Sequence, residues 1–132
     1  MTVHHIGYLV KSIDRASVKF FGELGYRNEG TTVYDEFRKI NILFMVNGDY
    51  RIELIESAAD DSMTGGLIKK LGVGPYHICY QVDSIEEAKV ELEKQRYVMT
   101  AAPEAAPALD GRRVAFFYHR DIGLIELLEV KQ

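Results

Sequence analysis

Two histidines and two glutamates recur at matching places in the two halves of this chain. The segment that starts at His5 aligns without a gap on the segment that starts at His77, and seven of the twelve compared positions are identical. Glu53 stands 48 residues after His5, and Glu126 stands 49 residues after His77. Imidazole and carboxylate groups are common ligands of divalent metal ions. If the two halves pack around a pseudo-twofold axis, equivalent positions converge, and the four side chains could bind one ion.

Alternation along a strand predicts which way the two glutamates point. Neighbouring side chains lie on opposite faces, so Glu53 faces away from Leu54, and Glu126 faces away from Leu127. We expect the leucines to pack beneath helices. Both glutamates would then share a face with the two histidines, on the concave side of the sheet, where the paired halves would enclose a cavity.

A ligand set of two imidazoles and two carboxylates suits Zn, Ni, Co, Mn or Fe(II), with water in any open position. A metal that holds a carbonyl oxygen stabilises the enolate formed when the neighbouring C–H loses its proton, and a nearby carboxylate can carry that proton. This is the chemistry of isomerases and lyases. A single strand histidine is more often a structural residue than a ligand, but recurrence in both halves favours the metal site.

The elements expected in the first half form a βαβββ module, residues 1–57. A strand over residues 3–10 leads to a helix that Ser12 caps and Gly25 ends. Phe20 and Phe21 have helical spacing and are expected in the core. Three β-rich runs follow, and the clearest hairpin joins residues 39–46 to residues 50–56.

A polar connector at residues 58–74, with one or two helical turns, leads to the second module, residues 75–132. There, Ser84 and Glu87 match a capping box at the start of a helix. A segment from Pro103 to Pro107 breaks the regular pattern before the last two strands. The whole chain is therefore expected to be one α+β domain of two paired modules that form a cupped mixed sheet.

Composition excludes several classes of function. The chain has 132 residues, with 47% hydrophobic and 27% charged residues, as in globular domains. Its net charge of −4 gives no electrostatic reason to expect a nucleic-acid partner. The apolar runs are far shorter than the roughly 20 residues of a membrane span, and no signal peptide is recognisable. With Cys79 as its single cysteine, the chain is expected in the cytoplasm.

These motifs resemble the vicinal oxygen chelate superfamily, also called the glyoxalase/bleomycin resistance/dioxygenase superfamily. The resemblance runs from Val3 to Glu129 and is strongest to methylmalonyl-CoA epimerases, on residues 61–68, 77–85, 111–119 and 123–127. It implies a glyoxalase-like fold, a homodimer and a thioester or thiol-adduct substrate. It also implies that His5, Glu53, His77 and Glu126 bind the metal ion (Zn, Ni, Co or Mn), with Glu126 as the base.

Other functions remain open on the same scaffold. Glyoxalase I, the lactoylglutathione lyase, shares the ligand pattern and nearly the same length. A metal-free protein that sequesters a drug would lack the full ligand set. An extradiol dioxygenase needs two histidines and one carboxylate around Fe(II), so the fourth ligand argues against that class.

Two positions bear on the substrate. Asn41 stands where some bacterial epimerases place a further carboxylate, which puts a two-base mechanism in question, although its amide could still bind substrate. Arg112 and Arg113 could bind a phosphate or carboxylate, but a solvated pair at a strand start is the commoner arrangement.

Overall fold

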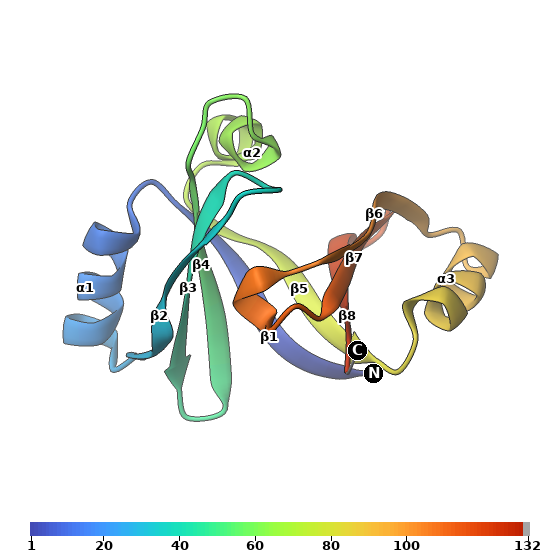
Figure 1. The fold of residues 1–132 in the computed structure, drawn as a ribbon, viewed down its shortest axis with the longest axis horizontal. Coiled ribbons are helices and arrows are strands. Elements are labelled where there is room, and N and C mark those ends of the chain that lie inside the picture. Colours follow the sequence, from blue (N-terminus) through green and yellow to red (C-terminus); the bar gives the residue numbers. More distant parts are fainter. Residues whose placement is uncertain (131–132) are drawn as a thin grey trace. The chain divides into compact units, whose positions relative to one another are not determined.

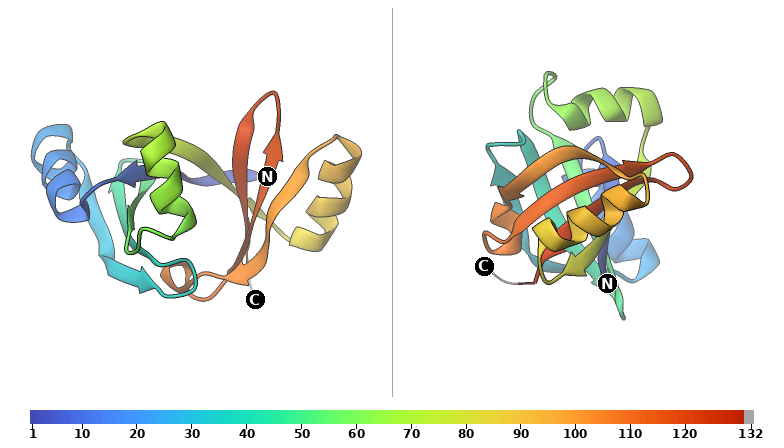
Figure 2. Two further views of the ribbon diagram at one scale, coloured as in Figure 1. Left: turned by 90° about the horizontal axis from the view of Figure 1, so that it is seen from above. Right: turned by 90° about the vertical axis from the view of Figure 1, so that its right-hand side faces the viewer.

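A computed structural model describes residues 1–130 of the chain, and Figures 1 and 2 show it from three directions. The described residues form eight strands and three α-helices, which confirms the α+β class and the βαβββ order in both halves. None of these helices has the length and apolar character needed to cross a bilayer. The elements are β1 (Thr2–Val10), α1 (Ile13–Leu24), β2 (Arg27–Asp35), β3 (Ile40–Asn47), β4 (Tyr50–Ser57), α2 (Met63–Leu71), β5 (Gly74–Val82), α3 (Ile85–Lys94), β6 (Val98–Ala105), the 3-10 turn η1 (Pro107–Leu109), β7 (Arg113–His119) and β8 (Gly123–Glu129).

The chain divides into two compact units. The first consists of His5–Tyr76, and the second of Met1–His4 with the chain from His77 onward. Within the first unit the strand order is β2-β3-β4-β1, and within the second it is β5-β8-β7-β6. In both, the module's first strand runs parallel to its last, and the other pairs are antiparallel. The two units therefore repeat one topology, as the repeated sequence predicts. A single domain of 132 residues stays a prediction.

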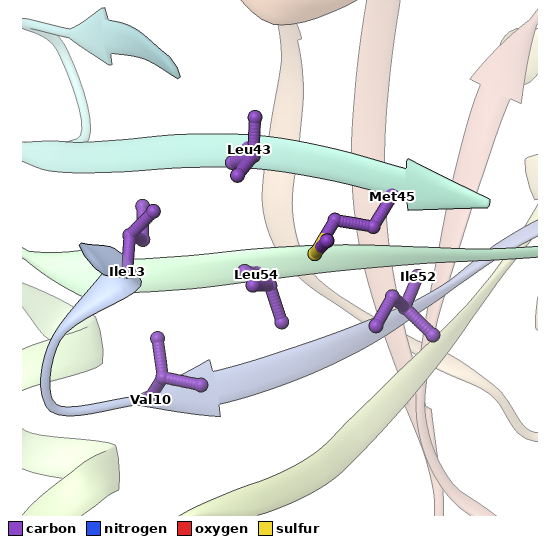
Figure 3. Close-up of a cluster of buried hydrophobic side chains, with 6 residues drawn as sticks. All are labelled: Val10, Ile13, Leu43, Met45, Ile52 and Leu54. Atoms are coloured by element: carbon purple, nitrogen blue, oxygen red, sulfur yellow. The ribbon is translucent and has the colours of Figure 1, made fainter. Parts of the chain in front are cut away.

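In the first unit, α1 packs on one face of the sheet (Figure 1). Ser12 caps the helix by accepting a hydrogen bond from the Arg15 amide, and Gly25 ends it in the left-handed conformation, with φ of 80°. Phe20 joins the core beneath the helix, whereas Phe21 is 66% exposed, so the prediction for Phe21 was wrong. Figure 3 shows the buried aliphatic cluster under α1, which consists of Val10, Ile13, Leu43, Met45, Ile52 and Leu54.

The second unit has an equivalent core beneath α3. Ser84 caps this helix by accepting from the Glu87 amide at 3.2 Å. Leu127 of β8 is fully buried there, at the position equivalent to Leu54. The cluster consists of Val82, Ile85, Ala115, Phe117, Ile125 and Leu127.

Two elements differ from the sequence-based expectation. The connector contains α2, a helix of nine residues, which is longer than the expected one or two turns. Of the segment from Pro103 to Pro107 that was expected to be irregular, residues 103–105 lie within β6, whereas Pro107 begins the 3-10 turn η1. β6 is the last strand in the order of its unit, and it pairs with β7 through two register shifts. Proline is tolerated in such an edge strand because the missing N–H is not needed by a second neighbour.

Candidate functional site

In the first unit, His5 of β1 and Glu53 of β4 form a close pair. Gly7, two residues after His5, is directly opposite Glu53 in the parallel β1–β4 ladder. His5 Nε2 lies 3.3 Å from Glu53 Oε1, and both side chains are buried. The ring of Phe44, from β3, meets the His5 ring edge to face, with 5.2 Å between centroids. The imidazole is thus oriented by an aromatic neighbour, with its Nε2 toward the carboxylate.

The second unit builds the same pair from β5 and β8. Cys79, two residues after His77, is directly opposite Glu126 in the β5–β8 ladder. His77 Nε2 lies 3.2 Å from Glu126 Oε1, and these side chains are also buried. Phe116 of β7 meets the His77 ring edge to face, again at 5.2 Å. The equivalent residues therefore adopt nearly the same geometry in both units.

The sheet places each pair on the face away from its helix. Leu54 and Leu127 lie in the cores beneath α1 and α3. Since adjacent side chains on a strand point to opposite faces, Glu53 and Glu126 face away from those cores, as the sequence predicts.

A second glutamate on each last strand has a different role, which the sequence did not reveal. Glu56 Oε1 accepts a hydrogen bond of 2.8 Å from the Ile13 amide, the first amide of α1. Its other oxygen accepts from the Asn41 side chain at 3.1 Å. A carboxylate at a helix N-terminus satisfies an orphan amide and complements the helix dipole. Asn41 therefore lies on the α1 face of the sheet and supports this cap.

Glu129 makes the equivalent cap in the second unit, where Arg113 takes the place of Asn41. Glu129 Oε2 accepts from the Ile85 amide at 3.1 Å and from Arg113 Nη2 at 2.7 Å. Arg113 also binds Glu86, at 2.8 Å. The Arg113 hydrogen bonds hold the pKa of Glu129 and that of Glu86 below their ordinary values. Arg113 is thus part of a structural ion network, which differs from the expected solvated arginine pair.

The repeat marks these two glutamates as equivalent but does not reveal that they cap helices. Glu56 and Glu129 occupy equivalent positions, three residues after Glu53 and Glu126. Each points to the face of the sheet that the helix of its unit covers. The missing signal was the partner, because the contact between a last strand and a helix start depends on how the chain folds back.

Comparisons with known proteins agree with this architecture. The sequence pattern of the Glyoxalase/Bleomycin resistance protein/Dioxygenase superfamily matches residues 4–116. The chain belongs to this superfamily. It is 28% identical to the mitochondrial methylmalonyl-CoA epimerase of Mus musculus over 98% of this chain and 72% of the mouse protein.

Solved structures confirm the glyoxalase-like fold. A hypothetical protein from Bacillus halodurans superposes with a TM-score of 0.87 at 31% identity, covering 99% of this chain and 95% of the other. Methylmalonyl-CoA epimerase from Mycobacterium tuberculosis has a TM-score of 0.84 at 20% identity, covering 97% of this chain and 87% of the other.

Proposed function

We propose that the two His–Glu pairs bind one divalent metal ion and that the protein is an epimerase for an acyl-CoA of the methylmalonyl type. The observation that carries this proposal is the repeated pair, with Nε2–Oε1 distances of 3.3 and 3.2 Å. Two ligands about 2.1 Å from one ion lie roughly 3.0 Å apart at a right angle and roughly 3.4 Å apart at a tetrahedral angle. Each pair therefore fits two adjacent positions around an ion.

The donor set also fits a metal of the expected kind. Two imidazole nitrogens and two carboxylate oxygens, without a thiolate, suit Zn, Ni, Co or Mn. The proposed ligands are His5 and Glu53 from the first module and His77 and Glu126 from the second. When bound, the ion would supply Lewis-acid polarisation of a substrate carbonyl, which favours loss of a proton from the neighbouring carbon.

The protein's own carboxylates would move that proton. Glu126 is proposed as the base that accepts the proton from the carbon next to the thioester, and Glu53 as its counterpart in the first module. Proton return to the other face of the same carbon inverts its configuration, which is epimerisation. Carboxylates held in fixed positions suit this task, because a positioned acid or base accelerates proton transfer about 10²- to 10⁴-fold.

Kinship supports this substrate class over the alternatives. The mouse relative is named a methylmalonyl-CoA epimerase, and it matches almost the whole of this chain. A lactoylglutathione lyase would use the same ligands, so only activity separates the two enzymes. A drug-sequestering protein would have no need for His–Glu pairs of matched geometry in both modules.

The test is proton exchange at the reacting carbon. Chelated and dialysed protein is incubated with methylmalonyl-CoA in D₂O, and Zn, Ni, Co or Mn is added in turn while mass spectrometry follows deuterium at C2. We expect exchange above the uncatalysed rate with at least one ion and none in the chelated protein. No acceleration with any ion would refute the epimerase. Isomerisation of the methylglyoxal–glutathione adduct instead would assign the protein as a lyase.

A further inference from the structure

In the second unit, a polar side chain lies on the same face of the sheet as the proposed ligands. Along β5, Gln81 falls on the same face as His77 and Cys79, because alternate residues share a face. Cys79 pairs directly with Glu126 across the ladder. Gln81 is two residues further, so it lies roughly 7 Å along the strand from the row that contains Glu126.

Arg112 reaches the same face from the start of β7. Phe116 pairs with Glu126, and Val114, two residues earlier, shares its face. The same alternation places Arg112 on this face. Its Nη2 donates a hydrogen bond to the Gln81 side-chain oxygen at 3.3 Å. A half-buried guanidinium and an amide thus stand together on the face of the sheet that carries the proposed ligands.

The backbone holds Arg112 in place through a tight turn. The Arg112 amide donates to the Leu109 carbonyl at 3.1 Å, and the Arg112 carbonyl accepts from the Ala106 amide at 2.9 Å. Gly111, just before it, has a φ of 75°, a conformation that suits glycine. The start of the Arg112 side chain is therefore fixed before any ligand binds.

The first module shows that the fold does not need this polar pair. The repeat aligns Gln81 with Leu9. Asn41 and Arg113 bind the equivalent glutamates Glu56 and Glu129, so the residues just before them, Ile40 and Arg112, are also equivalent. Leu9 is 1% exposed and Ile40 is 4% exposed. One module fills these positions with apolar side chains, whereas the other places a cation and an amide there despite the desolvation cost. Such a departure from the repeat points to ligand recognition.

We infer that Arg112, positioned by Gln81, binds an oxyanion of the substrate. The inference rests on the proposed function. A guanidinium presents a planar fork of donors that matches a carboxylate or a phosphate. The guanidinium contacts Gln81, which lies roughly 7 Å along β5 from the Glu126 row, and a carboxylate of the acyl group is one source of such an oxyanion. A phosphate of coenzyme A is the other source of the same chemistry.

Three variants test this role. Arg112→Gln removes the charge, and Arg112→Lys keeps the charge but loses the fork. The double variant Gln81→Leu/Arg112→Ile installs the residues that the first module uses, so it should keep the fold. Arg120→Gln is the matched control, because the Arg120 side chain is 90% exposed in the β7–β8 turn. Urea unfolding checks that each variant is folded.

Substrates with and without each anion identify which oxyanion is bound. For methylmalonyl-CoA, we expect Arg112→Gln and the double variant to raise KM about 10- to 100-fold, with a smaller change in kcat. The KM of Arg112→Lys should lie between that of wild type and that of Arg112→Gln. The KM of Arg120→Gln should equal that of wild type. If the acyl carboxylate is bound, methylmalonyl-pantetheine shows the same rise, and inhibition by propionyl-CoA is unchanged. If a phosphate is bound, only the CoA esters are affected.

An unchanged KM for both thioesters in folded Arg112→Gln protein would overturn the inference, as would a loss confined to kcat. Inactivity of the wild-type protein would instead count against the proposed function. In that case, calorimetric titration of methylmalonyl-CoA decides the role of Arg112. Weaker binding to Arg112→Gln than to Arg120→Gln would support it, and equal binding would refute it.

Discussion

Glu126 and Glu129 stand three residues apart on β8 and lie on opposite faces of the sheet. Glu126 approaches His77, whereas Glu129 caps α3 and binds Arg113. The same division holds for Glu53 and Glu56 in the first module. The glutamate that faces a histidine and the glutamate that caps a helix are thus separated by the alternation of side chains along one strand.

The two glutamates of β8 should therefore respond differently to the same substitution. We expect Glu126→Gln to lower turnover about 10²- to 10⁴-fold and to weaken metal binding, with little change in the urea midpoint of the chelated protein. Glu129→Gln should keep turnover within a few-fold but lower the free energy of unfolding by about 1 to 3 kcal/mol, because it loses charged hydrogen bonds. Enzyme assays and urea titrations of both variants measure this contrast. Equal loss of activity in the two would contradict the division of roles.

At this scale, duplication made the close pairs predictable. His5, Glu53, His77 and Glu126 could be selected because the same residue types recur at equivalent positions, and the structure confirms a short His–Glu distance within each unit. Arg112 was considered together with Arg113 as an anion-binding residue, but the repeat did not support that role because Arg112 departs from it. The contact with Gln81 is what distinguishes Arg112 from Arg113.

At the scale of elements, each helix is held by an apolar cluster and by capping groups. The clusters beneath α1 and α3 have equivalent central residues, Leu54 and Leu127, both fully buried. We expect Leu54→Ala and Leu127→Ala each to lower the free energy of unfolding by about 2 to 5 kcal/mol, through lost burial and the cavity left behind. Urea unfolding of both variants measures the loss. A cost below 1 kcal/mol in either would show that the cluster is not a packed core.

The Arg113 network should make the stability of the second unit depend on pH. Arg113 holds the pKa of Glu129 below its ordinary value of 4.5. A carboxylate with a lowered folded-state pKa stabilises the protein fully above the unfolded-state pKa, and it loses that contribution as the pH falls through the folded-state value. The difference in urea midpoint between wild type and Arg113→Gln should therefore be largest near pH 7 and should shrink below about pH 4.5.

Urea titrations of both proteins from pH 7 to pH 3 test this, with Arg120→Gln as the exposed control. A midpoint difference that stays constant across this range would mean that Arg113 acts by packing rather than by charge.

The elements differ in how well local sequence defines them. α1 was predictable because Ser12 and Gly25 mark both of its ends, and Ser84 marks the start of α3. The continuation of β6 past Pro103 was not predicted because a proline inside a strand is acceptable only at a sheet edge, and the edge position depends on pairing between distant residues. The helix in the connector was underestimated because Gly65 and Gly66 lower its apparent helix propensity. Gly65 is nevertheless buried against the carbonyls of Ala59 and Asp60, where a Cβ would lie only 3.1 Å from each.

At the scale of the whole molecule, we expect the proposed metal site to make stability depend on metal. A ligand that binds only the folded state stabilises it, by about 2.7 kcal/mol at a free concentration of 100 times Kd. Chelation should therefore lower Tm, and adding back the activating ion should restore it. Differential scanning calorimetry measures this shift, with Glu126→Gln protein as the control that should respond weakly. A Tm unaffected by chelation would argue against a metal site.

The repeat predicted the topology of the whole chain, because two similar sequences form two similar units. The repeat does not predict the quaternary state, because association of two chains depends on surface complementarity that has no counterpart in the repeat pattern. The homodimer implied by the family resemblance stays a prediction. Sedimentation velocity would determine that state.

The most direct test of the account is the number of metal ions that each chain binds. Calorimetric titration of the activating ion into chelated protein should give one ion per chain, and either His5→Ala or His77→Ala alone should abolish tight binding, because in the proposed site both modules supply ligands to the same ion. Two ions per chain, or tight binding that survives the loss of one histidine, would show that the pairs act separately and would contradict the shared site.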